Sequence, residues 1–212
     1  MGTEKIKRCV IITAGPMGEY SLLRGRIKPD DYIICVDGGA DHLKGLSVTP
    51  HIIIGDLDSA LKIPDGVEVL KFKSEKDETD TMLAVMHGLK MGFREFLLIG
   101  GLKGRLDHTF ANLSTLQYIE RHGAKGCFID SDNEAYFVEN SSMSFTKREG
   151  FYISVFPFGG DAVGVSEKGF KYKLDDAVMK TDFPNGVSNE FWADKGQISV
   201  KSGALLIIIS KK

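Results

Sequence analysis

The sequence predicts an α/β domain followed by a smaller all-β domain. Up to residue 134, short apolar segments rich in β-branched residues alternate with amphipathic helical patterns, which is typical of a mostly parallel sheet with helices on both faces. Beyond that point no helical pattern is found, and short alternating segments separated by glycines follow, as in a small β-sandwich. We therefore expect residues 1–134 to form the α/β domain and residues 135–212 the all-β sandwich domain.

The strands of the α/β domain are indicated by runs of Val, Ile and Leu that end at glycine or aspartate. They are expected over residues 6–14, 32–36, 52–54, 67–72, 96–99 and 127–129. In the second domain, strands are expected over residues 135–138, 151–158, 169–174, 198–200 and 204–209. Trp192, the only tryptophan, is expected in the sandwich core.

Two longer helices are expected in the α/β domain. The clearer one spans residues 77–91, with Asp77 or Thr79 as its N-cap. Its apolar side is formed by Met82, Leu83, Val85, Met86 and Leu89. The other spans residues 108–122, with Phe110, Leu113, Leu116 and Ile119 turned inward.

Composition excludes several classes of partner. The 212 residues carry a net charge of −2, so neither nucleic acid nor an anionic membrane surface is expected to bind. No apolar run reaches the length of a membrane span, and the first residues lack a signal-peptide pattern. Cys9, Cys35 and Cys127 stand far apart in apolar runs, as expected for buried thiols of a cytoplasmic protein.

Polar clusters follow four of the expected strands or open the helices after them. The clusters are Asp37-Gly38-Gly39, Asp56-Leu57-Asp58, Asp77-Glu78-Thr79-Asp80 and Gly104-Arg105-Leu106-Asp107-His108. Because the carboxyl ends of parallel strands share one edge of a sheet, all four clusters are expected at that edge. Their convergence indicates a site more strongly than any single cluster.

The residue types in these clusters suit the binding of a phosphate group and a metal ion. Paired glycines let backbone N–H groups approach a phosphate, and helix starts at Thr79 and His108 favour anions. Arg105 offers a forked donor for phosphate oxygens. Asp56, Asp58 and Asp80 supply the oxygen ligands that Mg²⁺ prefers. Each feature also has an ordinary structural alternative, as a polar turn, a helix cap or an ion pair.

Several common motifs are absent. The chain has no Walker A loop, no G-x-G-x-x-G, no H-E-x-x-H, no G-x-S-x-G and no C-x-x-C. Standard P-loop kinases, typical dinucleotide dehydrogenases and serine hydrolases are therefore disfavoured.

Taken in order, the four clusters resemble those of the thiamine pyrophosphokinase family, and the length and two-domain layout match as well. The family usually has two glycines before the arginine, whereas Lys103 replaces the first of them here. The resemblance implies that the diphosphate of ATP is transferred to the hydroxyl of thiamine, giving thiamine diphosphate and AMP. It also implies a homodimer with the site between subunits.

The resemblance implies roles for individual residues. Mg²⁺ would be held by Asp56, Asp58 and Asp80. The nucleotide-binding residues would be Asp37, Gly38, Gly39, Asp58, Ser59, Asp77, Thr79, Arg105 and His108. Thiamine would be bound by Asp80, Tyr172, Ser188 and Asn189, with the Tyr172 ring stacked on the cationic substrate. A core aromatic is the alternative for Tyr172, and either Asp80 or Asp107 would accept the proton.

Three other functions remain open at this level. Clustered aspartates and an Asp-His pair also occur in metal-dependent phosphoesterases. A nucleotide or vitamin binder without enzymatic activity is another alternative. A diphosphokinase for a different small alcohol is the third, because the choice of acceptor depends on the less legible second domain.

Overall fold

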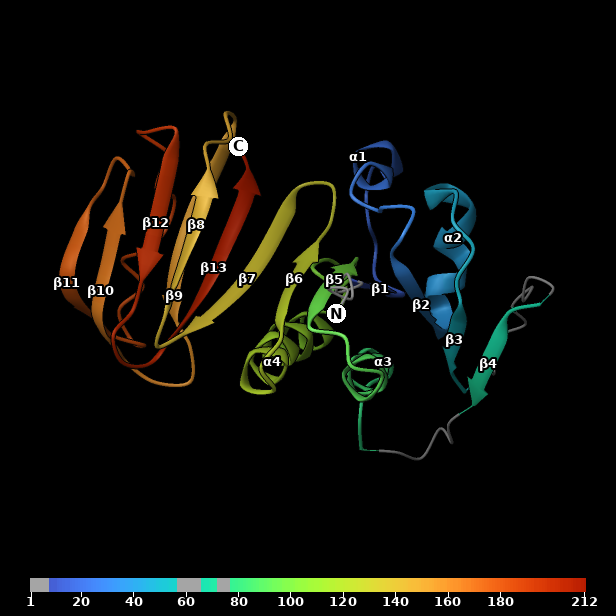
Figure 1. The fold of residues 1–212 in the computed structure, drawn as a ribbon. Helices are drawn as coiled ribbons and strands as arrows, with labels where there is room; N and C mark the ends of the chain where they lie inside the picture. Colours follow the sequence, from blue (N-terminus) through green and yellow to red (C-terminus); the bar gives the residue numbers. More distant parts are fainter. Residues whose placement is uncertain (1–7, 57–65, 72–76) are drawn as a thin grey trace, which may run out of the picture. The chain divides into compact units, whose positions relative to one another are not determined.

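The chain divides into two compact units, Met1–Ser131 and Asp132–Lys212. A computed structural model describes residues 8–56, 66–71 and 77–212 (Figure 1). The first unit holds a parallel sheet with helices on both faces, and the second holds only strands. The predicted fold class, an α/β sheet followed by an all-β sandwich, is confirmed.

In the first unit, six parallel strands of the described chain lie in the order β4-β3-β2-β1-β5-β6. They are β1 (Cys9–Ile12), β2 (Tyr32–Val36), β3 (Ile52–Gly55), β4 (Glu68–Lys71), β5 (Glu95–Ile99) and β6 (Lys125–Ile129). Every residue of β1 and β3 is buried, because helices cover both faces of a parallel sheet and leave no side for polar residues.

Helices α1 (Tyr20–Arg24) and α2 (Ala40–Leu46) cover one face, and α3 (Asp80–Lys90) and α4 (Leu106–Arg121) cover the other (Figure 1). A short 3₁₀ helix, η1 (Asp37–Gly39), follows β2 directly. On the α1 and α2 face, leucines of both helices pack on Val, Ile and Cys side chains of the strands. On the opposite face, a Cβ at Gly88 of α3 would lie 2.7 Å from the Phe96 ring, so this glycine lets α3 lie close to the sheet.

The helix predictions are confirmed in type and corrected in detail. Thr79 is the N-cap of α3, because its hydroxyl accepts the N–H of Met82 at 3.1 Å. In α4, Leu116 and Ile119 are buried as predicted, but Phe110 is 64% exposed. The buried stripe is Asn112, Thr115, Leu116 and Ile119. Phe110 precedes Asn112 by two residues, which turns it to the other side of the helix.

The second unit is a sandwich of two antiparallel sheets. One has the order β7-β13-β9, with β7 (Asn133–Glu139), β13 (Ala204–Lys211) and β9 (Phe151–Pro157). The other has the order β11-β10-β12-β8, with β11 (Leu174–Met179), β10 (Ala162–Lys168), β12 (Lys195–Ser199) and β8 (Ser142–Thr146). Apolar side chains from both sheets, including Ile153, Val165, Phe170 and Ile207, form its core.

Two predictions for this unit are wrong. Residues 169–173 are not part of a named strand, since β11 begins at Leu174. Trp192 is 74% exposed and is therefore not a core residue. Within the described part of the chain, no helix combines the length and the apolar character that crossing a membrane requires.

Candidate active site

A cavity of about 550 Å³ lies at the carboxyl edge of the parallel sheet. Strands β1 and β5 are neighbours in the sheet. The chain leads from β1 to β2 on one side of this pair and from β5 to β6 on the other, so the loops that follow β1 and β5 diverge. Open α/β sheets bind ligands at such a switch point. The cavity is lined by Thr13, Ala14, Gly15, Pro16, Val36, Asp37, Gly38, Asp56, Glu78, Thr79, Asp80, Thr81, Gly101, Lys103, Arg105, His108 and Asn112.

Three of the predicted aspartates line this cavity from three different segments. Asp37 begins η1, Asp56 follows β3 directly, and Asp80 is the first residue of α3. A Cβ at Gly55 would lie only 2.7 Å from the Cβ of Asp37. The glycine that ends β3 is therefore required for Asp37 to keep its place beside the end of that strand.

The carboxylates fit a hard divalent cation by their chemistry. Asp56 and Asp80 share the cavity, and carboxylate oxygens are the ligands that Mg²⁺ prefers. The third predicted ligand, Asp58, and its neighbour Ser59 lie outside the described residues. Among the side chains that the structure does describe, no group of three or more His, Cys, Asp or Glu is clustered to hold a metal ion.

Glycines let the loops of the cavity pack closely. A Cβ at Gly38 would lie 2.9 Å from the Cβ of Ala14, and one at Gly39 would lie 2.4 Å from the carbonyl oxygen of Ile12. Gly38 lines the cavity, whereas Gly39 is buried against β1 and is absent from the lining. Gly39 therefore serves the packing of η1, and of the two glycines only Gly38 faces the cavity.

Arg105 and Asp107 form an ion pair where α4 begins. The Nε and Nη2 groups of Arg105 donate to the two carboxylate oxygens of Asp107 at 3.2 and 2.6 Å. The backbone N–H of His108 also donates to Asp107, at 2.9 Å. The Arg105 hydrogen bond, then the backbone donor, lowers the pKa of the Asp107 carboxyl. Asp107 is absent from the cavity lining, which includes Arg105 and His108.

The remaining predicted residue of the first unit, Asp77, is exposed ahead of α3 and is also absent from the lining. Sequence reasoning missed Thr13 and Asn112. The Thr13 hydroxyl donates to the carbonyl of Ile99 at 3.1 Å, and the Asn112 amide donates to that of Gly101 at 2.9 Å. These bonds fix the loops after β1 and β5. The signal for Asn112 was a polar residue on the buried stripe of a helix.

Lys103, the residue that departs from the family pattern, also lines the cavity. Its Nζ lies 3.8 Å from the carboxylate of Asp130, which is fully buried, and 3.5 Å from the hydroxyl of Ser131. Both partners follow β6 directly. A glycine at position 103 would supply neither the charge beside Asp130 nor the cation at the cavity wall.

The predicted residues of the second unit differ in exposure. The Tyr172 side chain is 62% exposed, so it is not a core aromatic. Ser188 is exposed, has a φ of 60°, and donates its backbone N–H to the hydroxyl of Ser154 at 3.0 Å. Asn189 is only 6% exposed. Tyr172 and Ser188 are therefore open to a ligand, whereas the Asn189 side chain lies inside the unit.

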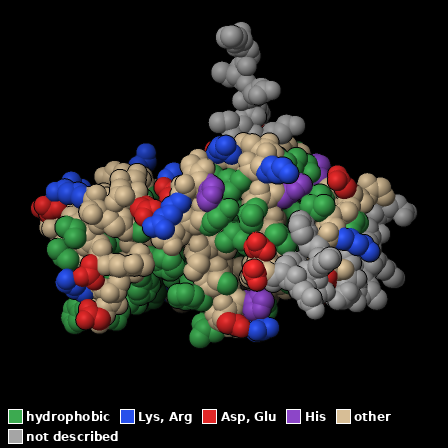
Figure 2. Space-filling model, turned by 90° about the horizontal axis from the view of Figure 1, so that it is seen from below, with side chains coloured by type: hydrophobic (Ala, Val, Ile, Leu, Met, Phe, Trp, Pro, Cys, Tyr) green, Lys and Arg blue, Asp and Glu red, His purple; other side chains and the backbone are tan. Residues whose placement is uncertain are grey.

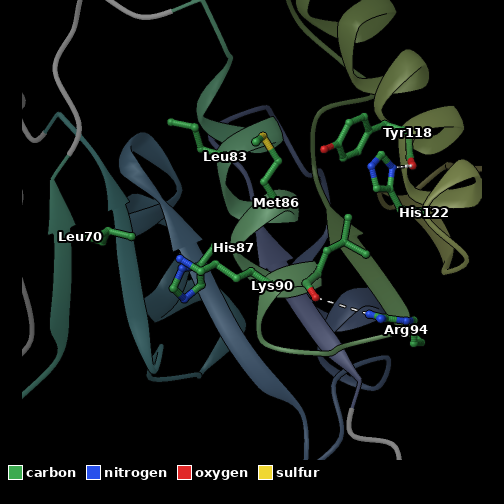
Figure 3. A pocket seen from close by; sticks show the side chains of 9 residues that line it. Leu70, Leu83, Met86, His87, Lys90, Arg94, Tyr118 and His122 are labelled. Carbon is green, nitrogen blue, oxygen red and sulfur yellow. Dashed lines mark hydrogen bonds between the residues drawn. The ribbon is translucent and has the colours of Figure 1, made fainter.

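A further cavity, of about 670 Å³, lies between β4, α3 and α4 toward the C-terminal ends of both helices (Figure 3). It is lined by Leu70, Leu83, Met86, His87, Leu89, Lys90, Arg94, Tyr118 and His122. Hydrophobic and histidine side chains appear together on this face of the first unit (Figure 2). No predicted site residue lines this cavity, so the chemistry is assigned to the carboxyl edge.

Comparisons with known proteins cover both units. The family model described as "Thiamin pyrophosphokinase, catalytic domain" matches residues 23–128, and "Thiamin pyrophosphokinase, vitamin B1 binding domain" matches residues 139–205. The chain is 28% identical to the thiamine pyrophosphokinase of Bacillus subtilis, over 97% of this chain and 99% of that one. It is 27% identical to thiamin pyrophosphokinase 1 of Caenorhabditis elegans, over 83% of this chain and 77% of that one. A crystal structure of the Bacillus subtilis enzyme matches with a TM-score of 0.89 and 26% identity, covering 97% and 100% of the two chains.

Proposed function

This chain belongs to the thiamin pyrophosphokinase family, and from that premise we propose how its residues divide the work of the reaction. The enzyme transfers the diphosphate of ATP to the hydroxyl of thiamine and releases thiamine diphosphate and AMP. The thiamine oxygen forms a bond to the β-phosphorus. The bond from that phosphorus to the oxygen bridging the α-phosphorus breaks, that oxygen leaves with AMP, and the hydroxyl gives up its proton.

The ATP phosphates are assigned to the cavity at the carboxyl edge of the sheet. The observation that carries this assignment is the convergence of Asp37, Asp56, Asp80 and Arg105 on one cavity at the switch point. Gly38 allows close approach of a phosphate to the backbone, and Thr79 and His108 lie at the starts of α3 and α4, where the helix dipole favours an anion. Asp77 and Ser59 are assigned to ATP on the basis of the sequence resemblance.

Mg²⁺ is assigned to Asp56 and Asp80, with Asp58 as the ligand expected from the sequence. An ion held there would supply positive charge to the diphosphate. Asp56 and Asp80 have the second task of fixing the place of the diphosphate relative to the thiamine hydroxyl. Positioning of this kind supplies much of the rate in phosphoryl transfer.

Arg105 is the side chain assigned to the transferred phosphates, and Asp107 is assigned to hold Arg105. Arg105 donates two hydrogen bonds to Asp107, which leaves other guanidinium N–H groups for a ligand, since the fork carries five. Asp107 is held by Arg105 and is absent from the cavity lining, whereas Asp80 lines the cavity. Of the two candidates for the thiamine proton, we therefore choose Asp80.

The exposed faces of Tyr172 and Ser188 are assigned to thiamine. The Lys171 Nζ lies over one face of the exposed Tyr172 ring, 5.5 Å from its centroid, so the opposite face is assigned to stack on the cationic thiazolium. We extend this to a homodimer in which the second unit of one subunit completes the site of the other. The support is the family resemblance and the separation of the assigned residues into two units. A cytoplasmic location is proposed because Cys9, Cys35 and Cys127, all within the described residues, are not joined in disulfides.

An assay of products tests this function directly. The protein is incubated with ATP and Mg²⁺, with and without thiamine, and AMP and thiamine diphosphate are measured. Equal amounts of AMP and thiamine diphosphate are expected, and only when thiamine is present. Release of AMP without thiamine would indicate a phosphoesterase, and transfer to a different alcohol in preference to thiamine would overturn the acceptor assignment. Omission of Mg²⁺ with EDTA present is expected to abolish both products.

A further inference from the structure

The Tyr172 ring is carried by a short two-stranded segment of the second unit, here called the Tyr172 ribbon. Residues 169–172 run antiparallel to residues 189–192. The N–H of Trp192 donates to the carbonyl of Gly169 at 3.0 Å, and that of Lys171 donates to the carbonyl of Glu190 at 2.9 Å. Between these bonds, Phe170 and Phe191 pair as a bridge. Phe170 is fully buried in the core, so the ribbon is anchored on that side.

At the Tyr172 end of the ribbon, a side chain replaces the partner backbone. The amide oxygen of Asn189 accepts the N–H of Tyr172 at 3.0 Å, and the amide nitrogen donates to the carbonyl of Tyr172 at 2.6 Å. Because the Tyr172 N–H requires an acceptor and its carbonyl a donor, this pair of bonds also settles which way the Asn189 amide points. Asn189 thereby holds the backbone on both sides of the exposed ring.

The other two bonds of the same amide are made within the second unit. The amide nitrogen donates to a carboxylate oxygen of Glu167 at 2.8 Å, and the amide oxygen accepts the backbone N–H of Glu190 at 2.9 Å. An Asn side chain has two donor hydrogens and two acceptor lone pairs. All four are therefore engaged with the protein itself, and the Asn189 amide has no hydrogen left for a substrate.

Glu167 accepts a hydrogen bond from the Asn189 amide and so fixes its position. It lies on β10 and is 2% exposed. Burial raises the pKa of its carboxyl, and the Asn189 hydrogen bond opposes that rise. A buried carboxylate is costly unless its hydrogen bonds are made. The Glu167 carboxylate accepts a hydrogen bond from Asn189, whose amide in turn holds the Tyr172 backbone. This chain of contacts indicates that Glu167 fixes the conformation of the Tyr172 ribbon.

We propose that Glu167 and Asn189 are positioning residues for the Tyr172 ring, so that Asn189 acts on thiamine binding through Tyr172 and not through its own amide. The proposal rests on the assignment of Tyr172 to thiamine made above. It adds Glu167, which lies outside every motif singled out in the sequence, to the residues on which thiamine binding depends.

The test compares Glu167→Met, which removes the acceptor, with Glu167→Gln, which keeps one. Losing a buried hydrogen-bond partner is expected to raise the KM for thiamine about tenfold in Glu167→Met. The KM for ATP stays at its wild-type value, and Glu167→Gln restores the KM for thiamine. In a Tyr172→Ala background, Glu167→Met is expected to add nothing further, because its effect passes through the ring. Equal effects of Glu167→Met in both backgrounds, or a matching rise in the KM for ATP, would overturn the proposal.

Hydrogen exchange is measured on the wild-type protein, so it does not depend on whether a variant folds. The Tyr172 amide is expected to exchange slowly in the wild-type protein although its ring is exposed, and fast exchange would contradict the proposal. The outcomes also distinguish a failure of this proposal from a failure of the assignment of Tyr172 to thiamine, on which it rests. If Tyr172→Ala leaves the KM for thiamine unchanged, the assignment of the ring to thiamine fails. If Tyr172→Ala raises that KM but Glu167→Met does not, only the positioning role fails.

Discussion

The guanidinium of Arg105 and the carboxylate of Asp107 face each other through two hydrogen bonds of 3.2 and 2.6 Å. Both side chains are exposed at the start of α4, where an ion pair contributes little to stability. We therefore propose that the ion pair serves to orient Arg105 beside the cavity, and not to stabilise the fold.

Replacing Asp107 by Asn is expected to lower kcat roughly tenfold, because Arg105 loses its charged anchor while the fold is unaffected. The lowered pKa of Asp107 means that the pair is present above that pKa and is lost as the pH falls through it. The wild-type kcat should therefore fall by up to about tenfold as the pH drops through this pKa, and Asp107→Asn should lack that fall. A loss of several orders of magnitude in kcat at neutral pH would instead identify Asp107 as the proton acceptor.

Asp56→Asn, Asp58→Asn and Asp80→Asn are each expected to reduce turnover by roughly two orders of magnitude or more, because each removes a charge that the diphosphate site requires. The circular dichroism spectrum should be unchanged. Glu95→Gln is the matched control, since Glu95 is exposed at the amino end of β5, opposite the cavity. Near wild-type turnover in Asp56→Asn or Asp80→Asn would contradict the metal assignment.

Changing Lys103 to Gly, the residue that the family pattern has at this position, is expected to destabilise the protein by about 1 kcal/mol. The cause is the loss of a cation 3.8 Å from the buried carboxylate of Asp130. Adding Asp130→Asn should recover most of that loss in urea unfolding. The KM for ATP is expected to rise several-fold in both variants, because Lys103 also lines the cavity. An unchanged KM for ATP would mean that Lys103 does not contribute to ATP binding.

Complementation tests the shared site of the proposed homodimer. Asp80→Asn and Tyr172→Ala chains are co-refolded and compared with each variant alone. If each site takes its two units from different subunits, half of the dimers contain one intact site, and about a quarter of wild-type activity returns. Co-refolding Asp80→Asn with Asp56→Asn, whose changes lie in the same unit, should restore nothing. Equal activity of the two mixtures would place each site within one chain.

Stability should depend on pH through Glu167. Its raised pKa means that the folded protein holds the carboxyl proton more tightly than the unfolded chain. The cost of the buried charge is present at neutral pH and disappears as the pH falls below the folded and then the unfolded pKa. Glu167→Gln is therefore expected to unfold at a higher temperature than the wild type at pH 7, with a difference that shrinks toward pH 4. A difference independent of pH would contradict this account.

Strand and helix types were predictable because local patterns determine them. The three isoleucines of β3 and the Thr79 cap of α3 are examples. The failures arise where burial depends on the phase of a helix or on partners far away in the sequence. Phe110 is exposed and Asn112 is buried because the stripe of α4 that meets the sheet begins at Asn112.

The residues of the site that follow a strand or begin a helix were predictable, because the ends of parallel strands share one edge of the sheet. Asp37, Asp56, Asp80 and Arg105 all follow strands or begin helices, and they line one cavity. Lys103 and Thr13 join that lining through loop packing that the sequence does not reveal. The Asn189 network was also invisible, because Glu167 lies 22 residues before Asn189 in the chain. The roles of the individual residues stay predictions until the variants above are measured.

The fully engaged amide of Asn189 has a consequence for affinity. Because the backbone on both sides of the Tyr172 ring is already held by Asn189, it loses little conformational entropy when a small cation binds to the ring. Ordering entropy, which commonly weakens the binding of small ligands to mobile loops, is thus largely removed beforehand. We expect thiamine to bind this surface quickly and with little change in the exchange rates of neighbouring amides.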